Sequence, residues 1–313
     1  MDRLRTDRLL TVAANRRRDG EQGPIGLVVV DKEPGWTSHD VVARCRRLFG
    51  QRRVGHAGTL DPDATGVLLV GLGRVTRTLR FLTALGKQYE AEVVLGTATS
   101  TLDASGDVVG TWDMSHVTLP DVKAAALTLT GDIEQVPPMV SAVKIGGRRL
   151  HELARAGVEV DRPPRPVTVS RFDVTAAPDA PGVFRIVVEC SSGTYIRVLA
   201  ADLGAALGGG AHLRALRRTR VGSFGSEEAC RLDELTPARI LTPVQALRDM
   251  AQVEVDDAAA RQVSHGLALD RVVLGAHGEG PWALVDHRGQ LLAVYEGTDT
   301  DRMVAACVLA ASG

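Results

Sequence analysis

The chain has few cysteines and no long apolar run. None of its 313 residues belong to a run of about 18 apolar residues, so no membrane-spanning helix is expected. Its four cysteines are scattered and form no Cys-x-x-Cys pair, which argues against a zinc site and a disulfide framework. This cysteine usage favours a reducing, cytoplasmic location. Residues 1–24 are polar and Arg-rich and lack the apolar core of a signal peptide, so we expect a disordered arm or a start-site extension.

Aromatic residues are also scarce, and the net charge is close to zero. Aromatics make up 4% of the chain, so few rings are available to stack on a nucleobase. The net charge of −1 hides an uneven distribution, because residues 250–313 hold nine acidic and only four basic residues. Basic residues elsewhere form three groups: Arg44, Arg46, Arg47, Arg52 and Arg53; Lys144, Arg148 and Arg149; Arg214, Arg217, Arg218 and Arg220. Each group is either a phosphate-binding surface or the solvated face of an ordinary element.

Hydrophobic periodicity places several elements along the chain. Gly26–Asp31 reads as a buried strand, and a helix follows in which Thr37 and Asp40 have capping-box spacing and Gly50 ends the element. That helix has an apolar stripe formed by Val41, Val42, Cys45, Leu48 and Phe49. Further elements are expected at 67–70 (apolar run), 74–85 (helix), 87–96 (alternating strand), 120–130 (helix), 184–190 (alternating strand) and 193–208 (helix).

The chain divides into regions of different composition. A main domain over residues 25–249 mixes strands and helices, and within it residues 135–165 are rich in proline, which is typical of a mobile excursion from a packed core. Residues 250–313 are acidic with short strand-like runs, and they predict a small β-rich appendage.

One carboxylate stands out in a glycine-rich loop. Asp61 lies between Leu60 and Pro62, with glycines at 55, 58 and 66. Glycine allows positive φ and close approach of the backbone to a ligand, and proline restricts the chain just after the carboxylate. An isolated Asp-Pro in a loop is most often a turn former, so the residues alone leave both a turn and a catalytic role open.

The residues around Asp61 favour the catalytic role over the turn. Gly55-His56-Ala57-Gly58-Thr59-Leu60-Asp61-Pro62-Asp63-Ala64-Thr65-Gly66 resembles the catalytic motif of the TruB-type tRNA pseudouridine synthases. Four further segments resemble motifs of that family in the same order, at 31–40, 87–91, 137–155 and 190–218, so the resemblance covers roughly residues 25–225. Two positions depart from it: Glu33 is an extra residue in the Lys-Pro motif, and His151 stands where a thumb tyrosine is usual.

The resemblance implies an α+β fold: a mixed α/β catalytic domain with a mixed central sheet, a thumb insertion near 135–165 and a PUA-like C-terminal β-barrel. It also implies roles for individual residues. The catalytic residues are Asp61, Arg197 and Tyr89: Asp61 is the nucleophile, Arg197 its cationic partner and Tyr89 the ring that stacks on the flipped base. A further hypothesis is that the Tyr89 hydroxyl takes the proton from carbon 5. Tyr195 and Leu216 belong to the substrate pocket, and His56 fills the space that the base leaves. Arg217 and Arg218 are expected to contact phosphate, and Asp103 is either a partner of the arginine or a turn former.

The implied activity is isomerisation of uridine 55 in the T-loop of tRNA, without cofactor, metal, guide RNA or protein partner, by a monomer. Two alternatives stay open. A guide-RNA-dependent synthase shares the motif, but its Lys-rich tail is missing here. A tRNA-binding or RNA-folding protein is the second alternative, although binding alone does not require Asp61, Tyr89 and Arg197 together. The first bond that Asp61 makes, to ribose or to base, is also left open.

Overall fold

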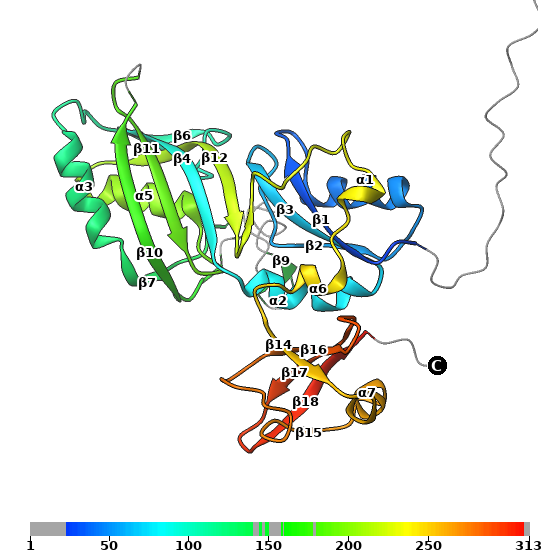
Figure 1. Ribbon diagram of the computed structural model, residues 1–313. Coiled ribbons are helices and arrows are strands. Elements are labelled where there is room, and N and C mark those ends of the chain that lie inside the picture. The colour runs from blue at the N-terminus through cyan, green and yellow to red at the C-terminus, as the bar shows by residue number, and fades with distance from the viewer. Residues whose placement is uncertain are drawn as a thin grey trace, which may run out of the picture.

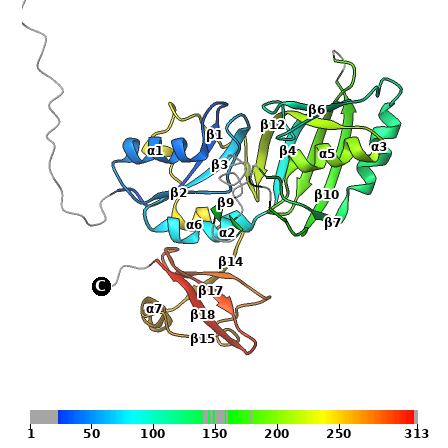
Figure 2. The same ribbon diagram turned by 180° about the vertical axis from the view of Figure 1, so that it is seen from behind.

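The computed structural model describes residues 23–139, 144–145, 148–149, 158, 160–177 and 180–309 (Figures 1 and 2). Residues 1–22, His151 and about half of the predicted thumb (140–143, 146–147, 150–157 and 159) lie outside this set. Two sheets dominate the described part, and the smaller one lies below the larger in both views. No described helix has the length and apolar character needed to cross a membrane. The four cysteines, all of which are described, are free thiols.

The larger sheet has nine strands in the order β1-β3-β12-β4-β11-β10-β7, with β2 paired to β3 and β13 paired to β12. Its strands are β1 (Gly26–Lys32), β2 (Val54–Ala57), β3 (Thr65–Leu72), β4 (Lys87–Leu95), β7 (Gly131–Gln135), β10 (Arg165–Ala176), β11 (Val183–Cys190), β12 (Ala211–Val221) and β13 (Phe224–Gly225). All pairings are antiparallel except the short parallel contact of β3 with β12, where Arg217 and Arg218 face Thr65 and Gly66. This contact joins the two halves of the sheet.

Helices cover the faces of this sheet. In Figure 1, α3 (Leu119–Thr128) and α5 (Ile196–Ala206) lie against the half formed by β4, β10, β11 and β12, and α1 (Ser38–Phe49) lies beside β1 and β3. The shorter helices are η1 (Gly73–Thr78), α2 (Leu79–Ala84), η2 (Pro237–Arg239) and α6 (Pro243–Ala246). Two ribbons complete the domain: β5 (Thr97–Thr99) with β6 (Val108–Thr111), and β8 (Lys144–Ile145) with β9 (Arg148–Arg149).

The smaller sheet contains β14 (Ala251–Val255), β15 (Leu269–Asp270), β16 (Trp282–Asp286), β17 (Leu291–Gly297) and β18 (Arg302–Val308), in the order β14-β16-β17-β18-β15. Helix α7 (Asp257–Ser264) packs against it. The predicted β-rich appendage is confirmed, and this sheet is compatible with a PUA-like domain.

The helix predicted after Thr37 is confirmed in detail. Thr37 and Asp40 form the reciprocal capping box, and Gly50 ends the helix in the left-handed conformation with φ of 62°. The predicted apolar stripe is wrong at one position, because Leu48 is exposed. The predicted loop around Gly55 is also partly a strand, β2. The segment predicted as a helix at 74–85 begins as a 3₁₀ turn, η1, before α2.

Both faces of the β1–β3 half are buried. Val28 and Val30 point into one apolar core with α1, whereas Leu27 and Val29 point into a second core on the opposite face. The second core also contains Val294 and other residues of the smaller sheet. Arg74 and Arg77 of η1 extend this junction, since their guanidinium groups donate to the carbonyls of Leu309 and Val308 at 2.9 and 2.7 Å. The two sheets are therefore joined by a shared apolar core.

A charge placed in this shared core should destabilise the whole chain. Val294→Asp introduces an unpaired carboxylate at a fully buried position, and we expect the melting temperature to fall by at least about 5 °C. Val304→Asp is the matched control, because Val304 is 42% exposed on the neighbouring strand β18. Thermal unfolding followed by circular dichroism measures both, and equal melting temperatures would contradict a shared core.

Candidate active site

The Asp61 loop, defined here as residues 58–64, connects β2 to β3 at the centre of the larger sheet. Ser38, at the start of α1, is buried and bonds both main-chain groups of Leu60: its hydroxyl accepts from the amide at 2.9 Å and donates to the carbonyl at 3.2 Å. The Asp61 carbonyl accepts from the Ala64 amide at 3.1 Å, which closes a turn. Asp61 is thus a turn residue as well as a candidate nucleophile.

Lys32 holds the Asp61 loop directly after Asp61, at Pro62. Its side chain is fully buried at the end of β1, and its ammonium donates to the carbonyls of Glu33, Trp36 and Pro62 at 3.0, 2.7 and 2.8 Å. Burial lowers the pKa of Lys32 to about 8, while the nearby carboxylates of Asp63 and Asp61 oppose this change. Lys32 lies in the motif at 31–40, but no role was predicted for it from the sequence. The signal that could have indicated a buried lysine is its position at the end of an apolar strand.

Arg218 holds the loop at its other end and does not lie where a phosphate can reach it. Only 1% of its surface is exposed. Its guanidinium donates to the carbonyl of Val67 at 2.7 Å and to that of Gly58 at 3.0 Å. The predicted phosphate contact of Arg218 is therefore wrong. The same strand carries Arg217, which donates to both oxygens of Asp31 at 2.9 and 2.8 Å.

Arg197 meets the Asp61 carboxylate with two nitrogens. Nε lies 3.0 Å from Oδ2, and Nη2 donates to Oδ1 at 3.3 Å. The arginine belongs to the first turn of α5 and its side chain is 5% exposed, whereas the Asp61 side chain keeps 43% of its surface accessible. A buried cation thus holds a carboxylate that stays open to a ligand.

Protein atoms around Asp61 also change its acidity. Burial raises the pKa of the Asp61 carboxyl above its ordinary value. The Arg197 charge is the strongest influence in the opposite direction, and the Asp103 charge adds to the rise. Burial can raise the pKa of Asp61 although its side chain is partly exposed, because protein atoms can surround a carboxyl group whose oxygens still contact solvent.

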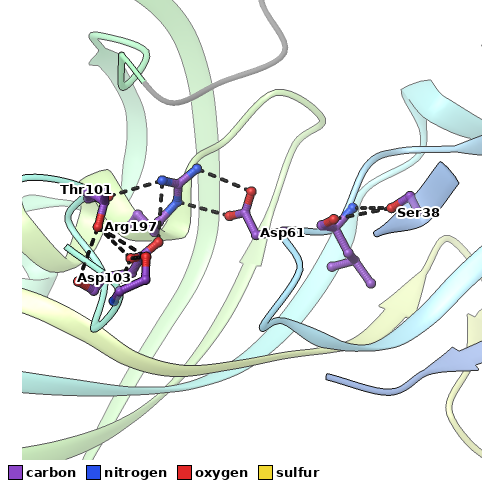
Figure 3. Close-up of polar contacts among 7 residues, drawn as sticks. Ser38, Asp61, Thr101, Asp103 and Arg197 are labelled. Carbon is purple, nitrogen blue, oxygen red and sulfur yellow. Dashed lines mark hydrogen bonds and ion pairs between the residues drawn. The ribbon is translucent and has the colours of Figure 1, made fainter. Parts of the chain in front are cut away.

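Asp103 lies on the other side of Arg197 (Figure 3). Its Oδ2 is 3.5 Å from Nη1 of the arginine, and the carbonyl of Thr101 accepts from the same nitrogen at 3.1 Å. The other carboxylate oxygen, Oδ1, accepts from the hydroxyls of Thr101 and Ser105, each at 2.6 Å. Asp103 is therefore both a turn residue and a neighbour of the arginine.

Tyr89 lies on β4 at the register position facing Arg218. It is 8% exposed and packs in the first apolar core. Burial raises the pKa of its phenol, and the charge of Arg218 opposes that rise. The Asp61 charge acts on the same phenol, so the two predicted catalytic groups are electrostatic neighbours.

His56 lies on β2 with its ring edge against His39, the two centroids being 5.4 Å apart. Its Nδ1 is buried and has no hydrogen-bond partner in the described part of the chain. Burial lowers the pKa of His56 to about 4, and the neighbouring His39 contributes. The imidazole is therefore uncharged at neutral pH.

The other predicted pocket residues lie on elements that meet this site. Tyr195 immediately precedes α5, and the side chain of Gln135 bonds its main chain twice: the Tyr195 amide donates to Oε1 at 2.8 Å and its carbonyl accepts from Nε2 at 3.1 Å. Leu216 is half-buried on β12 against the first core. Within the described residues, no three His, Cys, Asp or Glu side chains gather as metal ligands would.

The three basic groups found in the sequence differ in their exposure and in their ion pairs. Arg44 and Arg47 are exposed on α1. In the third group, Arg214 pairs with Glu92 at 2.8 Å and Arg220 with Glu189 at 3.3 Å, so carboxylates offset much of its charge. Of the second group, only the backbone of β8 and β9 is described.

Comparison with known proteins gives consistent matches along the chain. Residues 46–196 match the TruB family pseudouridylate synthase N-terminal domain, and residues 197–275 match the tRNA pseudouridylate synthase B C-terminal domain. The tRNA pseudouridine synthase B of Nocardia farcinica is 49% identical over 87% of this chain and 89% of that protein. The protein of the same name from Mycobacterium avium is 59% identical over 68% of this chain and 69% of that protein.

Solved structures resemble the whole described fold. A chain in the crystal structure of a Cbf5-Nop10-Gar1 complex has a TM-score of 0.69 at 27% identity, covering 91% of this chain and 84% of that one. A chain in the structure of an H/ACA RNP bound to a substrate RNA containing 2'-deoxyuridine has a TM-score of 0.67 at 25% identity, covering 90% and 83%.

Removing the Lys32 ammonium should loosen the Asp61 loop. In Lys32→Met three carbonyls lose their donor, and we expect the free energy of unfolding to fall by about 1–3 kcal/mol. Urea denaturation measures this change, and hydrogen exchange should show faster exchange of the amides of residues 58–64. Lys123→Met on exposed α3 is the control. An unchanged exchange rate in the loop would show that Lys32 does not hold it.

Removing the Arg197 guanidinium should raise the pKa of Asp61 further, since Arg197 is the strongest influence that lowers it. In Arg197→Met the carboxylate therefore takes up its proton at higher pH than in the unaltered protein. Carbon-13 NMR titration of labelled aspartates, with the Asp61 signal assigned by Asp61→Asn, measures the change. Arg214→Met removes an exposed arginine paired with Glu92 and should leave the Asp61 titration unchanged.

Proposed function

This chain belongs to the TruB family of tRNA pseudouridine synthases, and on that premise we propose that it isomerises uridine 55 in the T-loop of tRNA, with Asp61 as the nucleophile. Family membership makes it an enzyme that converts uridine to pseudouridine in tRNA. The position of the uridine, the residue roles and action without a guide RNA are the proposed part.

The two-nitrogen contact between Arg197 and Asp61 is the observation that carries this proposal. The reaction detaches uracil from its ribose, turns it and rejoins it through carbon 5, so it needs a nucleophile but no redox change or group donor. An ionised carboxylate can form the required covalent intermediate. Arg197 opposes protonation of Asp61 while leaving 43% of its side chain accessible. These are the two properties that a nucleophilic carboxylate needs.

The uridine has to leave its stack before it can reach Asp61. Extrusion of a base costs a few kcal/mol, which stacking and edge contacts in the enzyme offset. Tyr89 is the proposed stacking ring, and its buried phenol also lies near enough to Asp61 for their charges to interact. We propose that the oxygen of this phenol accepts the carbon-5 proton. Burial raises the pKa of Tyr89, so its own proton has to be passed on, and we assign its acceptance to the Asp61 carboxylate once the new carbon–carbon bond has formed and released that carboxylate. Tyr195 and Leu216 form the proposed pocket wall.

His56 is proposed to occupy the space that the base vacates. Its neutral imidazole suits this role better than proton transfer, because a pKa of about 4 leaves it unprotonated at neutral pH. Asp103 acts through Arg197, and Arg218 acts by holding the Asp61 loop.

Action without a guide RNA is supported by the balance of similarities. Identity is 48–59% with bacterial proteins named tRNA pseudouridine synthase B and 25–27% with the chains of the Cbf5 and H/ACA structures. We propose a cytoplasmic monomer that recognises the T-arm through the catalytic domain. The C-terminal residues 250–313 contribute at most modestly to RNA binding, because their surplus of acidic residues repels phosphate.

Release of tritium from transcripts labelled at carbon 5 of uridine tests the proposal. The protein alone should release tritium from unmodified tRNA, and a transcript with cytidine at position 55 should give none. Asp61→Asn should abolish release with tRNA affinity within a few-fold, because the amide cannot act as the nucleophile. Asp233→Asn, whose side chain is 71% exposed, serves as the control.

Each alternative gives a different result in this assay. Release that requires an added guide RNA would favour the guide-dependent class. Tight tRNA binding without any release would favour a binding or folding protein. Turnover retained by Asp61→Asn would remove Asp61 from its role.

A further inference from the structure

The turn between β5 and β6 contains an unusual backbone conformation. Among the residues that the structure describes, Leu102 is the one non-glycine residue with a positive φ, 63°. Leucine is disfavoured there because its Cβ lies too close to the following carbonyl oxygen. Strained residues of this kind persist only where the surrounding structure determines them, and they cluster at functional sites.

Contacts on both sides hold the turn in this conformation. The Leu102 amide donates to the Thr99 carbonyl at 3.2 Å, and its carbonyl accepts from the Leu213 amide of β12 at 3.0 Å. The Leu213 carbonyl in turn accepts from the Ala104 amide at 2.9 Å. Leu102 is thereby fixed to a strand of the larger sheet.

The residues flanking Leu102 both face one guanidinium. Before it, the Thr101 carbonyl accepts from Nη1 of Arg197 at 3.1 Å, and after it, the Asp103 carboxylate lies 3.5 Å from the same nitrogen. The Thr101 hydroxyl also donates to Asp103 at 2.6 Å. In an extended strand, neighbouring carbonyls alternate in direction and side chains at i and i+2 share a face, so a carbonyl and a side chain two residues apart do not converge in this way by default. The left-handed residue between them reverses the chain and brings both groups to Arg197.

We propose that Leu102 is a positioning residue: its left-handed conformation delivers the Thr101 carbonyl and the Asp103 carboxylate to Arg197 and so orients the arginine toward Asp61. This inference rests on the proposed role of Asp61. The leucine side chain is only half-buried, and its contribution here is the backbone conformation. This turn conformation explains why one side of the buried Arg197 guanidinium is fixed by the turn while its other side contacts Asp61.

A matched pair of substitutions separates backbone from side chain. Leu102→Gly and Leu102→Ala both remove the leucine side chain, and neither makes the left-handed conformation harder to adopt, because alanine carries the same Cβ penalty as leucine and glycine carries none. We expect both variants to keep kcat for tritium release within about threefold of the unaltered enzyme. Leu102→Val should lower kcat about tenfold or more, because a β-branched residue tolerates this φ least. KM should change little in all three.

The pH profile provides a readout that a merely structural role would not move. If Arg197 loses its orientation, the pKa of Asp61 rises, so the acidic limb of kcat in Leu102→Val should lie at higher pH than in the unaltered enzyme. In Leu102→Gly the limb should stay in place. The Arg197 Nε–H signal in nitrogen-15 NMR should shift in the valine variant and not in the glycine variant.

The outcomes separate this inference from the proposed function. Equal kcat in the glycine and valine variants would overturn it, whether both match the unaltered enzyme or both fall, since the conformation would then not matter. If Leu102→Val does not fold, as judged by circular dichroism, the glycine and alanine variants still decide, because a tenfold fall in both would show that the side chain and not the conformation is required. If the unaltered enzyme released no tritium, the proposed function would fail, and the NMR signal of Arg197 would still test the turn.

Discussion

The ion pair between Arg197 and Asp61 is the interaction on which the rest of the site depends. A guanidinium that is 5% exposed requires compensation for its lost hydration, and the Asp61 carboxylate, the Thr101 carbonyl and Asp103 supply it. The same contacts determine where Asp61 can lie. An arginine suits this position because its flat group can donate to partners on several sides at once, whereas a lysine presents a single point charge.

The loop that carries Asp61 is held mainly through its backbone. Lys32 bonds the Pro62 carbonyl, Arg218 bonds the Gly58 carbonyl, and Ser38 bonds Leu60 between them. Contacts of this kind leave the carboxylate itself free for Arg197 and for a substrate. The Lys32 ammonium also places a positive charge near Asp61, which favours its ionised form against the effects of burial and of the Asp103 and Asp63 charges.

The site lies where the two halves of the larger sheet meet, and the smaller sheet supports this junction from one face. The parallel contact of β3 with β12 brings Arg218 beneath the Asp61 loop, and β12 also fixes the Leu102 turn through Leu213. The shared apolar core then holds η1 and β17 together. An acidic C-terminal region thus has a structural place in an RNA-modifying enzyme whatever it contributes to binding.

Local chemistry explains what could be predicted from the sequence. The capping box of Thr37 and Asp40 and the left-handed Gly50 act over a few residues, so the helix between them was predictable, and the run of motif residues around Asp61 identified the family. Strand β10 was missed because a register shift between Val169 and Arg171 breaks its alternation, and β12 was missed because arginines fill it. The sequence by itself identified Asp61 and Arg197 as candidate site residues, and it located the elements whose signals are local, such as α1 and β4. Only the tertiary structure decided that Arg218 bonds the loop carbonyls, that Lys32 bonds three carbonyls and that Leu102 adopts a left-handed conformation in the turn that contacts Arg197. The physical reason is that burial and the direction of a side chain depend on strands brought together from distant parts of the chain.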